Sequence, residues 1–226
     1  SKCKDKDVLE VACGAGMGLG LLNKSAKNLV GGDFTQSIVS MARDHYGERV
    51  PVVCLDAHAL PFADCSFDVV LLVEAIYYLE KPNYFINECK RLLRPKGQLL
   101  IVSANKDLYD FNPSPFSHYY FGIKEFEELM VLHNFSVIFY GDMKVKNTSI
   151  RQRILRPLKW IAVRLNVIPG SMNSKRILKR LVFGKMVLMP AELNYSHCKP
   201  EPPVPLMLGF PNRGYKTIFV EATLKP

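Results

Sequence analysis

The 226-residue chain lacks several features that would place it outside the cytoplasm. No apolar run approaches the roughly 20 residues that a membrane-spanning helix needs, and the polar start SKCKDKD is not a secretory signal. Six cysteines are present, but no two of them form a C-x-x-C pair. These absences argue against a membrane span, a disulfide framework and a cysteine-based metal site. We therefore expect a cytoplasmic protein with reduced cysteines, and a further N-terminal piece before Ser1 because the first expected strand follows almost at once.

Acidic residues are scarce in the last third of the chain. Residues 143–226 hold 16 Lys and Arg against 3 Asp and Glu, whereas residues 1–142 hold 14 against 18. The excess positive charge, +9 for the whole chain, therefore lies in the last third. Such an asymmetry suggests two tasks along one chain.

Apolar runs alternate with helical patterns over the first half of the chain. We expect helices at 17–26, 35–47 and 82–93, and strands at 8–12, 28–33, 50–56, 67–75 and 98–104. In the second helix, Thr35 is the expected cap, Gly47 the expected end, and the apolar face holds Ile38, Met41, Ala42 and Tyr46. The continuously apolar run at 67–75 is typical of a strand covered on both faces. The alternation predicts an α/β fold with a Rossmann-like, doubly wound, mostly parallel sheet.

Beyond Ala104 the pattern becomes less regular. An aromatic loop at 107–122 is expected to cover a site, followed by a helix at 123–134 and strands at 135–142 and 215–224. About 70 structureless residues would be unusual in a compact domain, so we expect amphipathic helices at 150–167 and 174–189 and an irregular segment at 197–214. The prediction is a single domain over 1–226, seven-stranded with an antiparallel last strand, and with a basic helical insertion, 143–214, between strands six and seven.

The stretch LEVACGAGMGLG, residues 9–20, places a glycine turn between a strand and a helix. Such a turn presents backbone N–H groups and the positive end of a helix dipole to a ligand. It is not a phosphate-binding P-loop, because the position five residues after Gly14 is Leu19 and no Gly-Lys-Ser or Gly-Lys-Thr triplet follows, and it misses G-x-G-x-x-G from both Gly14 and Gly16. Gly18 and Gly20 are expected to let the helix pack close to the sheet. Both failures argue against a diphosphate ligand.

Glu10, Ala12, Gly14 and Gly16 instead resemble the first motif of class I S-adenosylmethionine-dependent methyltransferases, [DE]-x-G-x-G-x-G, with alanine at the first glycine. The cofactor of that family has no phosphate, and an acid complements its ammonium and sulfonium groups. The segments 67–82 and 91–104 are similar to the family's fourth-strand motif and to the turn before its fifth strand. The closest resemblance is to the group that includes the ubiquinone and menaquinone methyltransferases.

The resemblance implies a set of residues around S-adenosylmethionine. Asp33 would take the ribose hydroxyls, Asp56 the adenine amino group, the Ala57 N–H the ring, and Glu74 the cofactor's amino group. The full set of implied cofactor-binding residues is Glu10, Ala12, Cys13, Gly14, Gly16, Asp33, Phe34, Asp56, Ala57 and Glu74. No metal site is expected.

The resemblance further implies transfer of a methyl group to a small molecule, leaving S-adenosylhomocysteine. No N/D-P-P-Y motif is present, which favours oxygen or carbon acceptors over amino nitrogen. A catalytic residue cannot be assigned, since positioning of the acceptor can suffice. Side chains expected above the strand ends, and hence candidate bases, are His58, Glu74, Tyr77, Tyr78, His118, Tyr119 and Tyr120.

Several partners and functions stay open at this stage. The basic residues of 143–185 suit either an acidic acceptor, such as a nucleotide- or phospholipid-linked sugar, or an anionic membrane surface. Nucleic acid is disfavoured because no recognised binding motif accompanies the charge. A cofactor-binding but inactive regulatory or membrane-docking module is the alternative to an enzyme. An NAD-linked oxidoreductase is a third reading, against which the missing fingerprint argues. The sequence does not predict the oligomeric state.

Overall fold

The computed structural model describes residues 2–109, 111–145, 190–194 and 202–225. Its helices are α1 (Leu19–Asn23), α2 (Gln36–Tyr46), α3 (Pro82–Leu92) and α4 (Ile123–Leu132), with short 3-10 turns at Gly47–Arg49 and Ile76–Tyr78. The strands are β1 (Asp7–Val11), β2 (Asn28–Asp33), β3 (Val52–Cys54), β4 (Phe67–Val73), β5 (Leu93–Ala104), β6 (Phe135–Lys144), β7 (Val204–Leu206) and β8 (Tyr215–Leu224).

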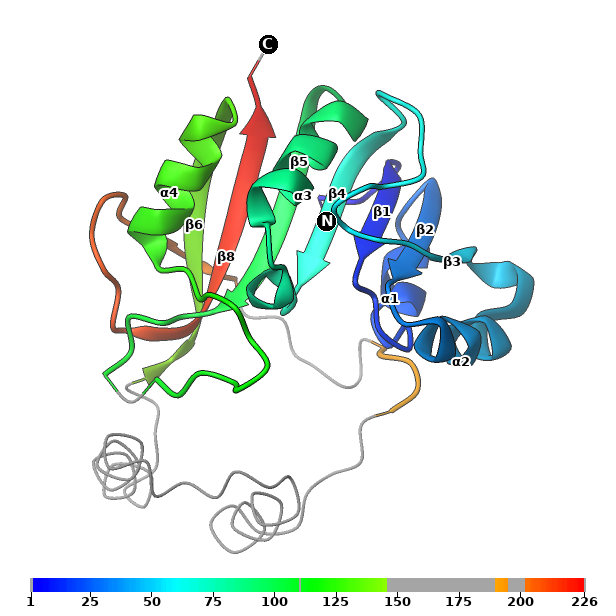
Figure 1. Ribbon diagram of the computed structural model, residues 1–226, viewed down its shortest axis with the longest axis horizontal. Helices are drawn as coiled ribbons and strands as arrows, with labels where there is room; N and C mark the ends of the chain where they lie inside the picture. The colour runs from blue at the N-terminus through cyan, green and yellow to red at the C-terminus, as the bar shows by residue number, and fades with distance from the viewer. Residues whose placement is uncertain (1, 110, 146–189, 195–201, 226) are drawn as a thin grey trace, which may run out of the picture.

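All of these strands form one sheet, in the order β3-β2-β1-β4-β5-β8-β6-β7 (Figure 1). Strands β1 to β5 run parallel to one another, and β8 lies antiparallel between β5 and β6. The expected Rossmann-like, mostly parallel sheet with an antiparallel last strand is therefore confirmed.

The described sheet has eight strands, one more than the seven predicted from the sequence. The additional strand, β7, falls in the segment 197–214 that was expected to be irregular. It pairs antiparallel with β6 over only three residues, Phe139↔Leu206 to Gly141↔Val204. Proline in a strand is tolerated at a sheet edge, and Pro205 lies in such an edge strand. Because the surrounding sequence is rich in proline, its pattern did not predict β7.

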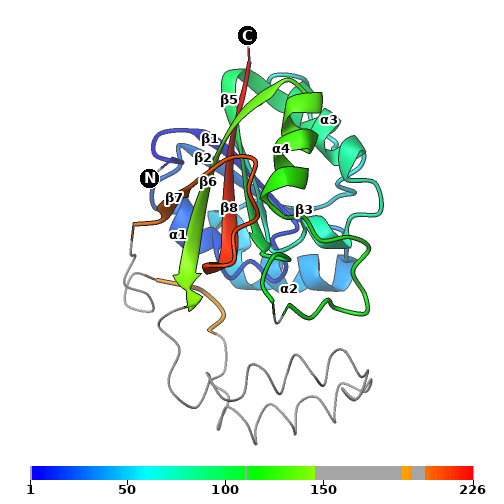
Figure 2. The same ribbon diagram turned by 90° about the vertical axis from the view of Figure 1, so that its left-hand side faces the viewer.

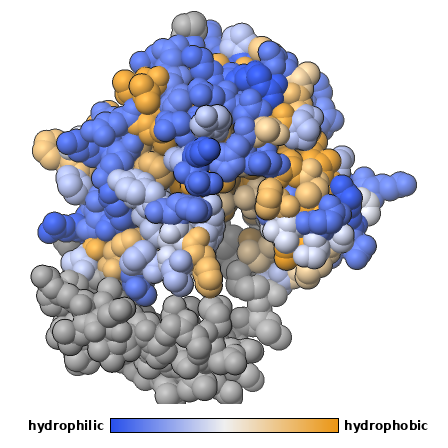
Figure 3. Space-filling model, viewed as in Figure 1, coloured by the Kyte–Doolittle hydropathy of each residue, from blue (hydrophilic) through white to orange (hydrophobic). Residues whose placement is uncertain are grey.

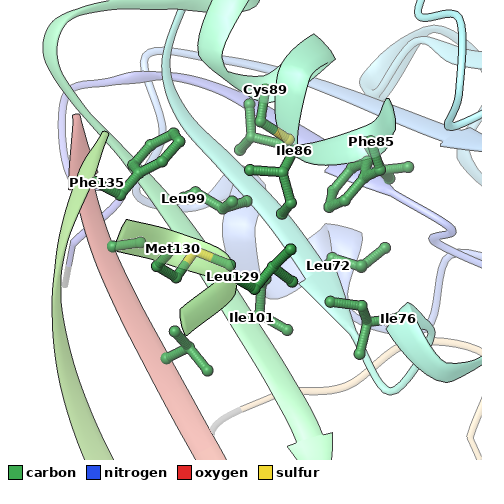
Figure 4. Close-up of a cluster of buried hydrophobic side chains, with 14 of the residues drawn as sticks. Leu72, Ile76, Phe85, Ile86, Cys89, Leu99, Ile101, Leu129, Met130 and Phe135 are labelled. Atoms are coloured by element: carbon green, nitrogen blue, oxygen red, sulfur yellow. The ribbon is translucent and has the colours of Figure 1, made fainter. Parts of the chain in front are cut away.

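Helices α3 and α4 cover one face of the sheet (Figures 1 and 2). Their apolar side chains interlock with those of β4, β5 and β6, and Figure 4 shows this cluster, which includes Leu72, Phe85, Ile86, Cys89, Leu99, Ile101, Met130 and Phe135. From this side the surface is predominantly hydrophilic (Figure 3), as expected where two amphipathic helices turn their polar faces to water.

On the other face of the sheet, α1 and α2 pack over β1 to β3, and the buried side chains include Val8, Leu19, Val39, Ala42 and Tyr46. Among the described residues no helix covers the part formed by β4, β5 and β8, where a hollow of about 420 Å³ is lined by residues such as Leu71, Leu100, Val102, Tyr140 and Phe219. On this face of β4, Val69 is buried in the cluster of α1 and α2, whereas Leu71 borders the hollow. The expected cover of β4 is therefore complete on the face of α3 and α4 and partial on the other.

Two helices differ from their predicted form. Helix α1 is shorter than the expected 17–26. Helix α2 begins after Thr35, whose side chain makes no capping bond, and ends at Gly47 with a φ of 55°. Its core face contains Val39 instead of Ile38 and Met41, and Met41 is 58% exposed. The helix is rotated so that Val39, Ala42 and Tyr46, spaced by three and four residues, meet the sheet.

The predicted insertion helices, 150–167 and 174–189, lie outside the described residues, as does most of the insertion 143–214. In the part of the chain that is described, no helix is both long enough and apolar enough to cross a bilayer. The carboxyl ends of β1 to β5 meet at one edge of the sheet, the lower edge in Figure 1, and the aromatic loop lies at the same edge. In doubly wound sheets this edge is where ligands bind.

Candidate functional site

The glycine loop between β1 and α1, residues 12–18, makes sharp turns at three positions. Ala12, Gly14 and Gly16 have φ angles of 57°, 57° and 82°, in the left-handed region that favours glycine. A side chain there costs roughly 1–2 kcal/mol, so Ala12 keeps the conformation of the glycine that it replaces at a cost. A Cβ at Gly14 would meet no atom within 4 Å. The loop therefore leaves its backbone open to a ligand at Gly14.

Glu10 lies in β1, directly before this loop. The residue is 7% exposed, and its Oε2 atom is buried without a hydrogen-bond partner among the described residues. Burial raises the pKa of Glu10 to about 7, because the carboxylate loses its hydration. A Cβ at Gly18 would lie 3.7 Å from Oε1, so the carboxyl group lies beside the start of α1. Burying an acid of this kind costs free energy unless a hydrogen-bond donor or a cation interacts with it.

Tyr46, at the end of α2, holds the glycine loop in place. Its hydroxyl donates to the Gly16 carbonyl at 2.5 Å and accepts from the Gly20 N–H at 3.0 Å. The first N–H groups of a helix have no partner within it, and this hydroxyl satisfies one of those of α1. The sequence placed Tyr46 on an apolar helix face but gave no signal that its hydroxyl reaches a loop 26 to 30 residues away.

Replacing Tyr46 by phenylalanine should lower the free energy of unfolding by about 1–3 kcal/mol, since the buried Gly20 N–H loses the hydroxyl acceptor and the Gly16 carbonyl keeps only the bond from the Leu19 N–H. Urea denaturation followed by circular dichroism measures the change. Tyr84→Phe is the matched control, because Tyr84 is 58% exposed, and it should leave stability within about 0.5 kcal/mol. Equal effects of the two substitutions would contradict the assigned role of the Tyr46 hydroxyl.

Asp33, the last residue of β2, joins the glycine loop to the loop that follows β2. One carboxylate oxygen accepts from the Gly14 N–H at 3.0 Å and the other from the Thr35 N–H at 2.9 Å. Each carboxylate oxygen has a second lone pair available, so these bonds leave capacity for a ligand. The neighbouring Phe34 is 73% exposed. The edge thus combines a fixed carboxylate with an aromatic side chain open to solvent.

Asp56 follows β3, which ends at Cys54 rather than at Asp56 as expected. Asp33 and Cys54 are partners in the parallel pairing of β2 and β3, so the loops after these strands are neighbours. The His58 N–H donates to Asp56 Oδ1 at 2.8 Å, and His58 Nδ1 lies 2.8 Å from the same atom. The backbone bond is the main reason that the pKa of Asp56 is lowered. Ala57 is buried between them.

Glu74, after β4, is exposed and has a φ of 53°. The Tyr77 hydroxyl donates to its Oε2 atom at 2.7 Å, and burial followed by this carboxylate raises the pKa of Tyr77 well above its usual value. Tyr77 stacks on Tyr120, with ring centroids 4.4 Å apart, and its carbonyl accepts from the His118 N–H at 2.8 Å. The aromatic loop is therefore fixed beside Glu74, and Tyr77 is poorly suited to act as a base at neutral pH.

The remaining candidate bases are placed differently. His58 is engaged with Asp56. The Tyr119 hydroxyl accepts from Lys106 at 3.1 Å, and Lys106 is also paired with Glu125 of α4. Tyr78 and His118 are exposed. These contacts single out no proton acceptor for catalysis.

Residues 190–194 contact the glycine loop and the end of α2, which the sequence did not predict. The Leu193 N–H donates to the Met17 carbonyl at 2.8 Å, and Glu192 pairs with His45 of α2 and with Arg49 of the 3-10 turn that follows α2, each at 3.1 Å. A Cβ at Gly20 would lie 1.9 Å from the Glu192 carboxylate. Gly20 therefore makes room for Glu192, and the expectation that it serves close packing of α1 on the sheet is wrong.

Comparison with known proteins agrees with this arrangement. A family of the description "Methyltransferase domain" matches residues 9–101, the span from β1 to β5 that contains the glycine loop, Asp33, Asp56 and Glu74. Residues 9–101 thus match a methyltransferase domain, and the predicted resemblance to class I S-adenosylmethionine-dependent methyltransferases is confirmed. Among the candidate bases, His118, Tyr119 and Tyr120 of the aromatic loop lie outside the matched part of the methyltransferase domain.

Named relatives agree with this match, and a solved structure shares the fold. A probable S-adenosylmethionine-dependent methyltransferase of Mycolicibacterium smegmatis is 32% identical over 149 residues, which cover 62% of this chain and 58% of that protein. A ubiquinone biosynthesis O-methyltransferase of Sinorhizobium medicae is 29% identical over 104 residues, 45% of this chain and 42% of that protein. The chain thus spans about half the length of these relatives. A crystal structure of a SAM-dependent methyltransferase from Aquifex aeolicus shares the fold of the methyltransferase domain, with a TM-score of 0.54, 23% identity and coverage of 61% of this chain and 76% of that one.

Proposed function

We propose that this protein transfers the methyl group of S-adenosylmethionine to a small-molecule acceptor and releases S-adenosylhomocysteine. The observation that carries the proposal is Glu10, a buried carboxyl with an unpartnered oxygen beside an open glycine loop. A cationic ligand group would complete this acid, whereas a diphosphate would be repelled by it. Glu10 therefore favours a methyltransferase over an NAD-linked oxidoreductase.

In this proposal, each end of the cofactor has its own residues. Glu10 complements the ammonium group, and the backbone of Ala12, Cys13, Gly14 and Gly16 follows the methionine part. Asp33 takes the ribose hydroxyls with its remaining lone pairs. Phe34 offers its exposed ring to one face of the adenine. Asp56 accepts from the adenine amino group, with the Ala57 N–H close to the ring, and Glu74 adds a second carboxylate for the ammonium group.

The bound cofactor supplies a methyl group that the sulfonium already activates. The protein's own residues then have to orient the acceptor and exclude water, which can account for much of the rate. The aromatic loop, held against Tyr77 by stacking and by the His118 N–H, is placed to do this. Oxygen or carbon acceptors are favoured, as argued from the sequence.

Binding of the acceptor is assigned, in this proposal, to the basic part of the chain. We propose a single domain in which the insertion 143–214 binds an acidic acceptor or rests on an anionic membrane through 143–185, in a cytoplasmic protein with peripheral membrane contact. A lipid-linked acidic acceptor satisfies both readings. The alternative function, a cofactor-binding but inactive module, has no observation in its favour.

Affinity for S-adenosylhomocysteine should rise about tenfold from pH 6 to pH 8. Because the pKa of Glu10 is about 7, the cofactor-free protein holds this acid mostly protonated at pH 6 and mostly ionised at pH 8, and only the ionised form attracts the ammonium group. The raised pKa has the opposite effect on stability without ligand. The folded state binds the proton more tightly than the unfolded chain, so this contribution is complete below about pH 4.5 and is lost as the pH rises through 7.

Isothermal titration calorimetry at several pH values measures the affinity, and Glu10→Gln is the control. This variant keeps the shape of the side chain but cannot ionise, so its affinity should be lower at pH 8 and independent of pH between 6 and 8. An unchanged pH slope in Glu10→Gln would exclude Glu10 as the ammonium-binding group.

Methyl transfer itself can be tested with cofactor that carries a labelled methyl group. The protein is incubated with polar and lipid extracts, and the label is followed into each fraction. We expect label in an acidic or lipid-linked small molecule, with none in the absence of protein. Binding of the cofactor without transfer to any fraction would favour the inactive module.

A further inference from the structure

The loop that carries Asp56 and Ala57, residues 56–64, is fixed mainly by side chains of α3. Its own backbone bonds are short-range, from Ala59 N–H to the Asp56 carbonyl and from Phe62 N–H to the Leu60 carbonyl. Loops with few internal bonds sample several conformations unless other elements restrain them. The restraint in this case comes from two side chains of α3, Glu88 and Arg91.

Arg91 contacts the loop at three points. Its Nη1 atom donates to the Phe62 carbonyl at 2.7 Å and to Asp64 at 2.8 Å, and its Nη2 atom donates to the Leu60 carbonyl at 2.9 Å. Glu88 accepts from the Leu60 N–H at 2.7 Å and is itself paired with Arg91 at 2.7 Å. Both backbone groups of Leu60 are therefore bound by side chains from α3. Only the planar, multi-donor guanidinium group can serve carbonyls and carboxylates together.

These contacts act on the core side of the loop. Leu60 and Ala57 are 3% and 8% exposed, whereas the Asp56 side chain is 49% exposed. Arg91 and Glu88 thus leave the ligand side free, and Leu60, the residue that both of them bind, follows Asp56 by four positions. A side chain that restrains a binding loop raises affinity by increasing the fraction of binding-competent molecules.

We propose that Arg91, oriented by Glu88, is a positioning residue that holds the loop 56–64 in its adenine-binding form. The proposal rests on the proposed function, because it assumes that Asp56 and Ala57 receive the adenine. Arg91 touches the loop and not the ligand, so it acts through the loop backbone.

Arg94 provides a matched control three residues away. Its Nη1 atom contacts Asp7 at 2.8 Å and Asp68 at 3.1 Å, and its side chain is 38% exposed, against 32% for Arg91. Both arginines therefore bridge two carboxylates at similar exposure. Asp7 and Asp68 lie at the amino ends of β1 and β4, at the edge of the sheet opposite the candidate site. Loss of the Arg94 side chain should lower the stability of the fold but leave the affinity for the ligand unchanged.

The experiment compares Arg91→Met and Arg94→Met in calorimetric titrations with S-adenosylhomocysteine, well below the unfolding temperature of each variant. This ligand has no net charge, so loss of a distant cation should not change its binding. We expect the Kd to rise about tenfold in Arg91→Met, because reducing the fraction of binding-competent molecules to about a tenth raises the apparent Kd by the same factor. In Arg94→Met the Kd should stay within about twofold of the wild-type value. Arg91→Lys should fall between wild type and Arg91→Met, because it restores one donor group but not the fork.

Hydrogen exchange of the loop amides gives a second readout. Exchange at 58–64 should become faster in Arg91→Met and stay unchanged in Arg94→Met. If Arg91→Met does not fold, Glu88→Gln replaces it, with a rise in Kd of about threefold expected from the weakened orientation of Arg91. Unchanged affinity in the Arg91 or Glu88 variant, or an equal loss in Arg94→Met, overturns the proposal. Wild-type protein that binds no S-adenosylhomocysteine overturns the proposed function instead, and this inference with it.

Discussion

Asp33→Ala should weaken the binding of S-adenosylhomocysteine at least about a hundredfold. In the proposed site, the Asp33 carboxylate accepts from two ribose hydroxyls, and hydrogen bonds to a charged group contribute roughly 1.5–3 kcal/mol each. The same carboxylate also holds the Gly14 N–H and the Thr35 N–H. The substitution therefore removes ligand contacts and loosens the loops on both sides of the ribose position.

Calorimetric titration of Asp33→Ala measures this loss, and Asp56→Ala is the comparison. In the proposed site Asp56 accepts from the adenine amino group, and its bonds to His58 lie within its own loop, so Asp56→Ala should lower the affinity about tenfold. Asp142→Ala is a neutral control, because Asp142 lies on β6, which β1, β4, β5 and β8 separate from β2 and Asp33. An Asp33→Ala variant that binds as tightly as Asp142→Ala would contradict the assignment of the ribose position.

Gly16→Ala should lower the free energy of unfolding by about 2–5 kcal/mol. Gly16 has a φ of 82°, and a Cβ there would lie 2.6 Å from the buried Tyr46 ring. Left-handed backbone with a side chain costs roughly 1–2 kcal/mol, and overpacking a buried contact adds about 1–3 kcal/mol. The Tyr46 ring is buried in the core and cannot move aside without breaking its bonds to the glycine loop.

Gly14→Ala separates the two contributions to that loss. Gly14 is also left-handed, at 57°, but a Cβ there meets nothing within 4 Å, so only the backbone cost of about 1 kcal/mol remains. Chemical denaturation of both variants gives the comparison. Equal destabilisation by the two substitutions would show that the contact between Tyr46 and Gly16 is not as tight as described.

The regular part of the fold follows directly from local sequence patterns. Strand β2 has the predicted bounds, because an apolar run ends at an acid, and α3 begins at Pro82, which favours the first turn of a helix. The order of strands and helices is enough to predict the sheet. The glycine loop was recognised because its left-handed positions need residues of one type, and Ala12 was noticed as the exception to that rule.

The supports of the site were not predictable in the same way. Tyr46 and Arg91 contact loops about 30 residues distant, and Glu192 reaches α2 across more than 140 residues. Such contacts depend on tertiary packing, and no local period or spacing marks them. Gly20 is an example, since the space left by its missing side chain is occupied by Glu192, a residue far away in the sequence.

The account depends most on the claim that the loop from Ala12 to Gly18 holds a sulfonium cofactor and not a dinucleotide. A calorimetric titration of the wild-type protein at pH 8 with S-adenosylhomocysteine, and in parallel with NAD⁺, tests this claim directly. The account predicts a one-to-one complex with S-adenosylhomocysteine of micromolar affinity and no heat of binding for NAD⁺. Binding of NAD⁺, or the absence of binding to S-adenosylhomocysteine, would contradict it.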